Sequence, residues 1–171
     1  MTRQLYLITG PSGAGKSTIA EYLTEAGHTA IDADVTPGLC YYVNKNGKPV
    51  PYPGAGADAS WWAGHNYVWE IDRLKKLIGT FEDNGKPIFL CGNAGNIVKA
   101  WSMFAAVFYL DIPATILIKR TSKAPDQLDQ LVSWLEPFKA EMLGSGAVLI
   151  DATVPVEVAA RSILKHIKAG S

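Results

Sequence analysis

The sequence predicts a three-layer α/β sandwich in which helices cover both faces of a five-stranded parallel sheet. Short apolar runs alternate with helix-compatible segments along all 171 residues, which is typical of parallel strands joined by crossover helices. A glycine-rich turn separates the first strand from the first helix. No internal repeat, low-complexity tract or change of composition divides the chain. We therefore expect residues 1–171 to form a single domain.

The first strand and helix flank the most informative stretch of the chain. The apolar run Leu5-Tyr6-Leu7-Ile8 comes first, and a helix-compatible segment, residues 19–26, follows. Between them lies Gly10-Pro11-Ser12-Gly13-Ala14-Gly15-Lys16-Ser17-Thr18, which fulfils the pattern G-x-x-x-x-G-K-[ST]. Strand, glycine turn and helix together are the context in which this pattern is meaningful. They indicate a P-loop NTPase fold.

Each residue type in this loop suits a nucleoside triphosphate. Glycines allow successive backbone N–H groups to turn inward around an anion, and the helix that follows adds its positive dipole end. The Lys16 ammonium can reach the β- and γ-phosphates, and the Ser17 hydroxyl can bind the accompanying Mg²⁺. We therefore predict that residues 10–18 bind ATP and Mg²⁺; the loop itself does not distinguish ATP from GTP.

The second strand introduces two candidate carboxylates. Gly27 ends the first helix, residues 29–31 form a short strand, and Asp32-Ala33-Asp34 follows directly. If this segment stays extended, both carboxylates point the same way and face the γ-phosphate. A carboxylate there can hold Mg²⁺ or accept a proton from an attacking hydroxyl. The alternative is that both aspartates only cap their own loop.

An aromatic cluster follows in a region that we expect to bind the substrate. Residues 35–60 are rich in proline and glycine and are expected to be irregular, whereas residues 61–81 have helical spacing up to Asn84-Gly85. Flat rings with a polar edge suit a planar base or a sugar ring, although they can also simply cover the sheet. The aromatic cluster comprises Tyr41, Tyr42, Tyr52, Trp61, Trp62, Tyr67 and Trp69, and the same stretch also carries His65, Asp72 and Arg73. From this region we predict the substrate-binding residues Trp61, Trp62, His65, Trp69, Asp72 and Arg73.

The rest of the chain completes the sheet. Further strands are expected at residues 87–91, 105–110 and 147–150, and further helices at residues 113–120, around the apolar stripe 128–142, and at 156–168. Ligands of such sheets bind beyond the carboxyl ends of the strands. Asp111 closes the fourth strand where some ATPases carry a magnesium-side acid, but Ile112-Pro113 follows it, which favours a structural role at the start of a helix.

Composition restricts the function classes. The 16 basic and 16 acidic residues cancel, which argues against a nucleic-acid groove or an anionic membrane surface. Cys40 and Cys91 have no metal-site spacing and suit a reducing cytoplasm. Arginine is scarce, and an acceptor that already carries phosphate is usually clamped by arginine forks. The composition thus favours a cytoplasmic protein acting on a small molecule with a free hydroxyl. We expect a monomer or a homodimer, between which the sequence does not decide.

These motifs together resemble the small P-loop kinases of the adenylate kinase and shikimate kinase type. Asp32-Ala33-Asp34 is similar to the Asp-x-Asp after strand two of shikimate kinases, which implies that Asp32 serves Mg²⁺ and Asp34 the substrate. Gly92-Asn93-Ala94-Gly95 stands where those kinases have a glycine-rich substrate turn. Residues 65–72 resemble a segment of uncharacterised bacterial nucleoside/nucleotide kinase-like ATPases.

The resemblance extends to the nucleotide side. Residues 107–121 are similar to the fourth strand and helix of these kinases, which implies that Arg120 packs on the adenine and opens a short lid at about 120–126. Asp151-Ala152-Thr153-Val154-Pro155 resembles their adenine-contacting loop, which implies nucleotide contacts from Thr153 and Pro155. The lid departs from the pattern, since Lys123 is its only further cation.

The sequence therefore predicts an ATP-dependent small-molecule kinase with a substrate-binding insertion at about 35–82. Lys16, Asp34 and Arg120 are the expected catalytic residues, and Ser17 and Asp32 the metal ligands. The acceptor is expected to be a nucleoside, nucleotide or shikimate-like hydroxyl compound. The alternative is a nucleotide-binding switch or slow ATPase that acts through a protein partner. A kinase of nucleic-acid ends is disfavoured by the zero net charge.

Overall fold

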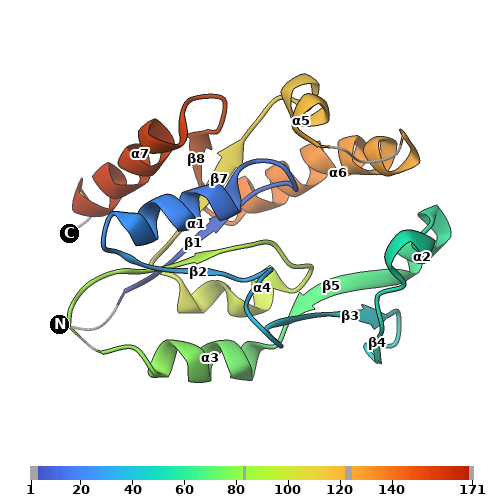
Figure 1. The fold of residues 1–171 in the computed structure, drawn as a ribbon, viewed down its shortest axis with the longest axis horizontal. Coiled ribbons are helices and arrows are strands. Elements are labelled where there is room, and N and C mark those ends of the chain that lie inside the picture. Colours follow the sequence, from blue (N-terminus) through green and yellow to red (C-terminus); the bar gives the residue numbers. More distant parts are fainter. Residues whose placement is uncertain (1–3, 83, 122–124, 170–171) are drawn as a thin grey trace.

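A five-stranded parallel sheet forms the centre of the protein (Figure 1). The structure is a computed structural model that describes residues 4–82, 84–121 and 125–169. The strand order is β2-β6-β1-β7-β8, with β1 in the middle and every one of its residues buried. The predicted α/β sandwich and its five strands are thus confirmed. The strands are β1 (Leu5–Thr9), β2 (Thr29–Asp32), β6 (Ile88–Cys91), β7 (Ala106–Asp111) and β8 (Val148–Asp151).

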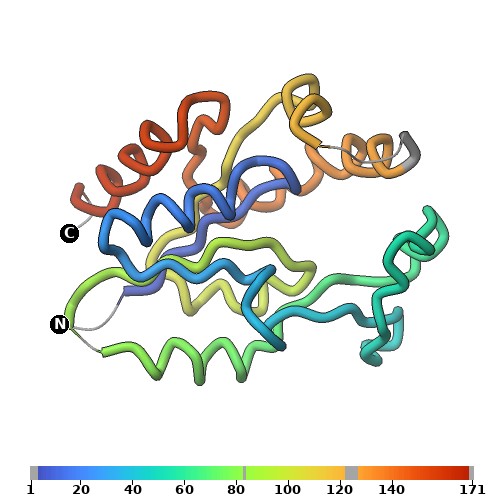
Figure 2. The backbone as a smooth tube through the Cα atoms, in the orientation of Figure 1, coloured from blue at the N-terminus to red at the C-terminus, as the bar shows by residue number. Residues whose placement is uncertain are grey.

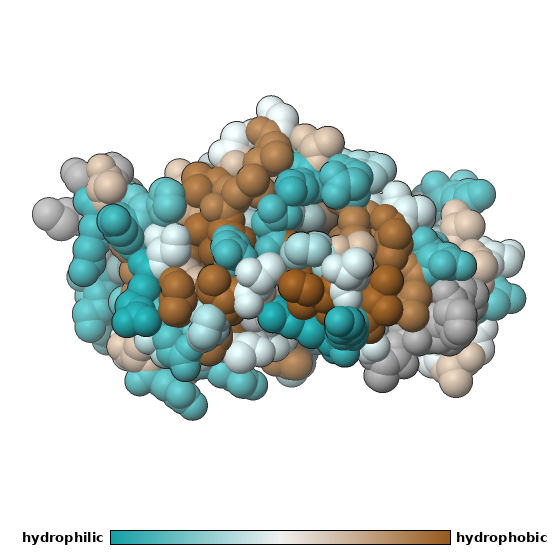
Figure 3. All heavy atoms as spheres, turned by 90° about the horizontal axis from the view of Figure 1, so that it is seen from above, coloured by the Kyte–Doolittle hydropathy of each residue, from teal (hydrophilic) through white to brown (hydrophobic). Residues whose placement is uncertain are grey.

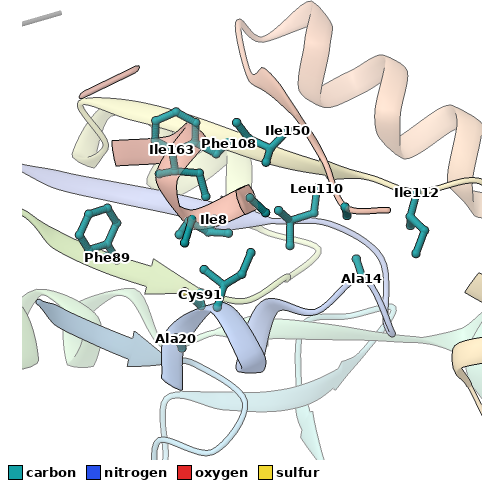
Figure 4. Close-up of a cluster of buried hydrophobic side chains, with 14 of the residues drawn as sticks. Ile8, Ala14, Ala20, Phe89, Cys91, Phe108, Leu110, Ile112, Ile150 and Ile163 are labelled. Carbon is teal, nitrogen blue, oxygen red and sulfur yellow. The ribbon is translucent and has the colours of Figure 1, made fainter. Parts of the chain in front are cut away.

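Two hydrophobic cores lie on opposite faces of this sheet. Side chains alternate along β1, so that Tyr6 and Ile8 enter one core and Leu5 and Leu7 the other. Figure 4 shows part of the first core, where sheet residues such as Ile8 meet helical side chains. This core is covered by α1 (Lys16–Glu25), α5 (Ala114–Arg120) and α7 (Val156–Ala169); the second is covered by α3 (Ile71–Gly79), α4 (Ile97–Ala100), the short η2 (Trp101–Met103) and α6 (Pro125–Gly144).

A second, antiparallel sheet lies between β2 and β6 in the chain. Its order is β4-β3-β5, formed by β3 (Cys40–Asn44), β4 (Pro49–Val50) and β5 (His65–Trp69). The short η1 (Gly54–Gly56) and α2 (Ala59–Gly64) connect β4 to β5. Figure 2 follows the chain out of the main sheet after β2, through this second sheet and back along α3 to β6.

Two sequence predictions are wrong in this region. Residues 35–60 are not irregular, because they contain β3 and β4. Residues 61–81 are not one helix, because α2 ends at Gly64 and α3 begins only at Ile71. The intervening residues alternate as a strand and pair with β3, Tyr67 lying opposite Tyr42. Pairing between strands distant in sequence overrode the helical spacing of the large side chains.

The second sheet is fastened to the loop that follows β6. The Gly95 N–H donates to the Tyr67 carbonyl at 2.7 Å. The Asn96 carboxamide makes two hydrogen bonds with the backbone of Trp69, accepting from its N–H and donating to its carbonyl, both at 2.9 Å. These three bonds tie β5 to the loop after β6 and so hold the second sheet beside the main sheet.

The outer surface mixes hydrophobic and hydrophilic residues. On the face shown in Figure 3, hydrophobic atoms are exposed mainly toward the middle, interspersed with hydrophilic ones. Within the ranges that the structure describes, no helix has both the length and the apolar character needed to cross a membrane.

Candidate active site

A cleft of about 1150 Å³ opens beyond the carboxyl ends of the parallel strands. One wall is residues 12–19, which include most of the predicted phosphate loop and the start of α1. The opposite wall comes from the second sheet and α2, and the loops after β2, β6 and β8 complete the cleft. The cleft therefore joins the predicted nucleotide and acceptor sides in one space.

The phosphate loop has the backbone geometry that an anion cradle requires. Gly10, Gly13 and Gly15 have φ angles of +152°, +89° and +98°, which other residues rarely adopt. A Cβ atom on Gly10 would also lie 3.0 Å from the Leu110 Cβ atom. Gly15 caps α1 without a side-chain hydrogen bond, so the first N–H groups of this helix are left for a ligand. Gly10 and Pro11 form the base of the loop and do not line the cleft.

Lys16 begins α1, and its side chain reaches back to the start of this loop. Its side chain is only 8% exposed, and Nζ donates hydrogen bonds to the carbonyls of Gly10 at 3.0 Å and Pro11 at 2.9 Å. Burial lowers the pKa of Lys16, while the carboxylates of Asp34 and Asp32 oppose this shift. The ammonium is thus held among loop carbonyls with two carboxylates in electrostatic range, and phosphate oxygens would give it a stronger partner.

Asp32 ends β2 and Asp34 lies in the turn that follows, so the segment Asp32-Ala33-Asp34 is not extended throughout as expected. The Asp34 N–H donates to Asp32 Oδ1 at 3.0 Å, which bends the chain immediately after β2. As a result Asp34 lines the cleft, whereas Asp32 does not. The Tyr67 hydroxyl donates to Asp34 Oδ1 at 3.1 Å and thereby orients this carboxylate. Of the two acids, only Asp34 therefore faces the cleft.

The turn after β6 contributes Asn93 to the cleft. The Asn93 Oδ1 atom is buried and has no hydrogen-bond partner among the described residues. Gly92 has a different part, since a Cβ atom there would lie 2.7 Å from the Cβ atom of Ala33, which is fully buried. Gly92 therefore allows the turns after β2 and β6 to pack together and does not line the cleft.

Of the predicted aromatic site residues, one lines the cleft and the others pack behind its wall. Trp62 lines the cleft, and its Nε1 atom is buried without a partner in the described part of the chain. Trp61 does not line the cleft but stacks on His65, with ring centroids 4.4 Å apart and an interplanar angle of 16°. Trp69 is 1% exposed and belongs to the second core. Trp61, His65 and Trp69 thus support the wall from outside.

Asp72 and Arg73 lie on α3 and not in the cleft. Asp72 forms an ion pair with Lys75 at 3.5 Å on the helix surface. The Arg73 guanidinium is close to Gly38, where an added Cβ atom would meet Cζ at 3.0 Å. These two residues were expected in the substrate site because a single helix was expected to carry them beside the aromatic residues. Because strand β5 separates α2 from α3, both residues lie on a different helix, outside the cleft.

The nucleotide side brings Arg120 and Pro155 into the cleft but not Thr153. Arg120 donates from a terminal nitrogen to the Ala152 carbonyl at 2.9 Å, which ties the end of α5 to the loop after β8. Thr153 instead donates to Asp151 through its N–H at 2.8 Å and its hydroxyl at 2.6 Å, and these bonds lower the pKa of Asp151. Of the predicted lid, residues 122–124 lie outside the described residues.

Asp111 lies outside the cleft lining. Its carboxylate pairs with Lys139 of α6, Oδ1 to Nζ at 2.8 Å, and its carbonyl accepts from the Ala152 N–H at 2.9 Å. This pairing agrees with a structural interpretation of Asp111. Within the described ranges, no group of three His, Cys, Asp or Glu side chains gathers into a metal cage. A magnesium ion that arrives with a nucleotide needs only one or two protein ligands.

Sequence reasoning did not single out several cleft residues. Tyr42, Tyr52 and Tyr67 were placed in the aromatic cluster but not selected as site residues. The Asn46-Gly47 pair between two β-compatible runs is a hairpin signal that would have indicated β3 and β4. The nucleotide side also includes three apolar residues that no motif indicates, namely Ile19, Val156 and Ala159.

The fold and its glycine-rich loop define a P-loop protein of the small-kinase type. Residues 7–144 match the model of the family described as AAA domain, and the chain belongs to this family. The sequence matches no curated protein.

Solved structures with the same fold include small-molecule kinases. Shikimate kinase from Acinetobacter baumannii, in complex with shikimate, is 18% identical with a TM-score of 0.63, covering 100% of this chain and 96% of its own. Deoxyadenosine kinase from M. mycoides with bound dATP is 16% identical with a TM-score of 0.54, covering 97% and 100%. Gluconokinase from Sinorhizobium meliloti 1021 is 18% identical with a TM-score of 0.52, covering 99% of each.

Proposed function

We propose that the protein is an ATP-dependent kinase that transfers the γ-phosphoryl group to a hydroxyl of a small molecule, which can be a nucleoside, a nucleotide or a shikimate-like compound. One observation carries the proposal. Asp34, oriented by Tyr67, lines the same cleft as the phosphate loop and lies within electrostatic range of Lys16. A carboxylate so placed can accept a proton beside the γ-phosphate. The likeness to kinases of known fold supports the same reaction class.

In the proposed reaction the acceptor oxygen attacks the γ-phosphorus while Asp34 takes the hydroxyl proton. The bond from the γ-phosphorus to the bridging oxygen breaks, and ADP leaves. Lys16 and Arg120 neutralise charge on the transferring group and the ADP oxygens. Ser17 lines the cleft at the start of α1, so its hydroxyl would hold Mg²⁺, which supplies positive charge to the phosphates. Asp32 does not line the cleft but lies within electrostatic range of Lys16, and it would serve this ion through a bound water.

The proposal treats residues 1–171 as one domain with two working segments. Residues 35–82 would bind the acceptor, and residues 120–126 would close over the nucleotide, which excludes water that would otherwise hydrolyse ATP. A neutral cytoplasmic monomer or homodimer suits such an enzyme.

The test is acceptor-dependent release of ADP from ATP and Mg²⁺, measured over nucleosides, nucleotides and ring hydroxy acids. We expect Asp34→Asn to lower kcat by about 100-fold or more, because the proton acceptor is lost. Asp111→Asn is the matched control and should keep kcat within about threefold, since Asp111 pairs with Lys139 outside the cleft.

The reverse ranking of these two variants would favour a nucleotide-dependent switch or slow ATPase. In that case Asp111→Asn would abolish magnesium-dependent nucleotide binding, and Asp34→Asn would have no effect. ADP release that no acceptor accelerates would also contradict the kinase proposal.

A further inference from the structure

The acceptor half of the cleft carries little charge. We define it as the lining residues from the second sheet, α2 and the turns after β2 and β6, namely Asp34, Tyr42, Tyr52, Trp62, Tyr67 and Asn93. Asp34 is its one ionisable acid. Among the described lining residues, positive charge comes from Lys16 in the phosphate loop and Arg120 at the end of α5. An anionic acceptor would thus face a carboxylate without a described cation of its own, which is unfavourable in a partly buried site.

Aromatic faces make up most of this half. Tyr42 packs against Tyr52 with ring centroids 5.1 Å apart and an interplanar angle of 23°, and against Tyr67 at 4.9 Å. Trp62 meets Tyr42 nearly edge-on, at 5.9 Å and 70°. None of these rings is fully buried, and Tyr52 is 50% exposed, so ring surface remains for a ligand. Flat faces set at different angles border a site suited to a planar ring.

Two polar side-chain atoms of the lining residues lack partners within the described structure. They are the donor Nε1 of Trp62 and the acceptor Oδ1 of Asn93, both buried. A buried polar atom without a hydrogen bond is costly, and such atoms usually meet a ligand or water. A carboxamide presents an acceptor and a donor side by side, the arrangement that pairs with the edge of a nucleobase.

We propose that the acceptor is an unphosphorylated nucleoside, whose base lies among the rings and bonds Asn93 and Trp62, and whose sugar hydroxyl faces Asp34. This inference rests on the proposed function and narrows its substrate class. A nucleotide or a ring hydroxy acid would add negative charge beside Asp34. A free sugar would offer these rings less flat apolar surface than a base does. In the reaction the sugar oxygen bonds the γ-phosphorus, the proton passes to Asp34, and ADP leaves, giving a nucleoside monophosphate.

The test measures binding and transfer separately on the full chain. Calorimetry without ATP compares nucleosides, their 5′-monophosphates, neutral monosaccharides and ring hydroxy acids; ADP release and product mass are then measured with ATP and Mg²⁺. We expect at least one nucleoside to bind and to be phosphorylated. Its own monophosphate should bind about tenfold more weakly or worse, because it brings negative charge to Asp34.

Variants connect this binding to the named residues. Trp62→Phe keeps a ring but removes the indole N–H, and Asn93→Leu removes the carboxamide at similar volume. Each should weaken nucleoside binding about five- to tenfold while the KM for ATP stays within about twofold. Trp134→Phe is the matched control, because Trp134 stacks on Phe138 of α6 away from the cleft and its replacement should not alter binding. Two different positions keep the test decisive if one variant does not fold.

The outcomes separate the two proposals. Nucleoside binding that depends on Trp62 or Asn93, without ADP release, would support the ligand class and overturn the kinase function. Phosphorylation of a monophosphate, sugar or hydroxy acid, with no nucleoside bound, would overturn the nucleoside inference and leave the kinase function standing. Failure of every nucleoside to bind, or binding unchanged in both variants, would also overturn it.

Discussion

At the scale of single residues, Cys40 shows how closely the second sheet packs against the acid turn. Its Sγ atom donates to the Ala33 carbonyl at 3.1 Å, between the two aspartates in sequence, and lies beside Tyr67. Burial is the main cause that raises the pKa of Cys40, from 9.0 to about 11, and the carboxylate of Asp34 adds to it. Burial likewise raises the pKa of Tyr67. Both groups therefore remain protonated at neutral pH.

This pKa predicts slow alkylation of Cys40. At pH 8 the native thiol should react with iodoacetamide about 100-fold more slowly than in the unfolded chain, since the thiolate is the reactive form. The folded pKa lies above the unfolded value, so native reactivity should climb as pH rises from 9 toward 11, and the native state should lose stability over the same interval. Peptide mapping by mass spectrometry distinguishes Cys40 from the fully buried Cys91. Equal native and unfolded rates at pH 8 would contradict this.

Residue-level prediction from the sequence succeeds where a role is encoded locally. The bounds and backbone geometry of the loop at residues 10–18 could be predicted because its glycines, Lys16 and Ser17 are neighbours in the chain. Asp34 was selected correctly as a cleft residue, but its separation from Asp32 depends on a side-chain hydrogen bond within the turn. Nothing in the spacing of two aspartates distinguishes a turn from an extended segment. The burial of Trp69 likewise depends on partners far along the chain.

At the scale of elements, the main sheet was predictable and the second sheet was not. The inner strands β1 and β6 are nearly continuous apolar runs because both of their faces are covered. Residues 65–69 instead carry large side chains whose spacing fits a helix as well as a strand. Their pairing with residues 40–44 decides the outcome, and this pairing is invisible to a local pattern.

The two hydrogen bonds between the Asn96 carboxamide and the Trp69 backbone should contribute to stability. Asn96→Ala should lower the free energy of unfolding by about 1–3 kcal/mol, because it leaves the backbone N–H and carbonyl of Trp69 without these partners. Hydrogen exchange of the Trp69 amide should accelerate well beyond that of the central strand β1.

Asn84→Ala is the matched control for this prediction. The Asn84 carboxamide accepts one bond from the Lys86 N–H at 3.0 Å in an exposed turn, so its loss should change stability by no more than about 0.5 kcal/mol. If the two variants had the same free energy of unfolding and the same hydrogen-exchange rate at Trp69, the hydrogen bonds of Asn96 would not stabilise the fold.

At the scale of the whole molecule, nucleotide binding should stabilise the folded chain. At 100 times its dissociation constant, a magnesium–nucleotide complex should add about 2.7 kcal/mol to the free energy of unfolding, measured by urea denaturation. Lys16→Met should abolish most of this gain, because the ammonium would be the main charge partner of the phosphates.

Lys165→Met is the control, because Lys165 is exposed on α7 and this variant removes the same charge far from the phosphate loop. It should retain the whole nucleotide-dependent gain. Equal gains in both variants would show that the nucleotide binds without the buried ammonium of the phosphate loop.

The position of the second sheet in the chain has a consequence for the evolution of such proteins. It begins after β2 and ends before β6, and these two strands are direct neighbours in the main sheet. The whole excursion can therefore be lengthened, shortened or exchanged without changing the order of the five parallel strands. If residues 35–82 bind the acceptor as proposed, a graft of this segment between proteins of this fold should change the acceptor and leave residues 10–18 unaltered.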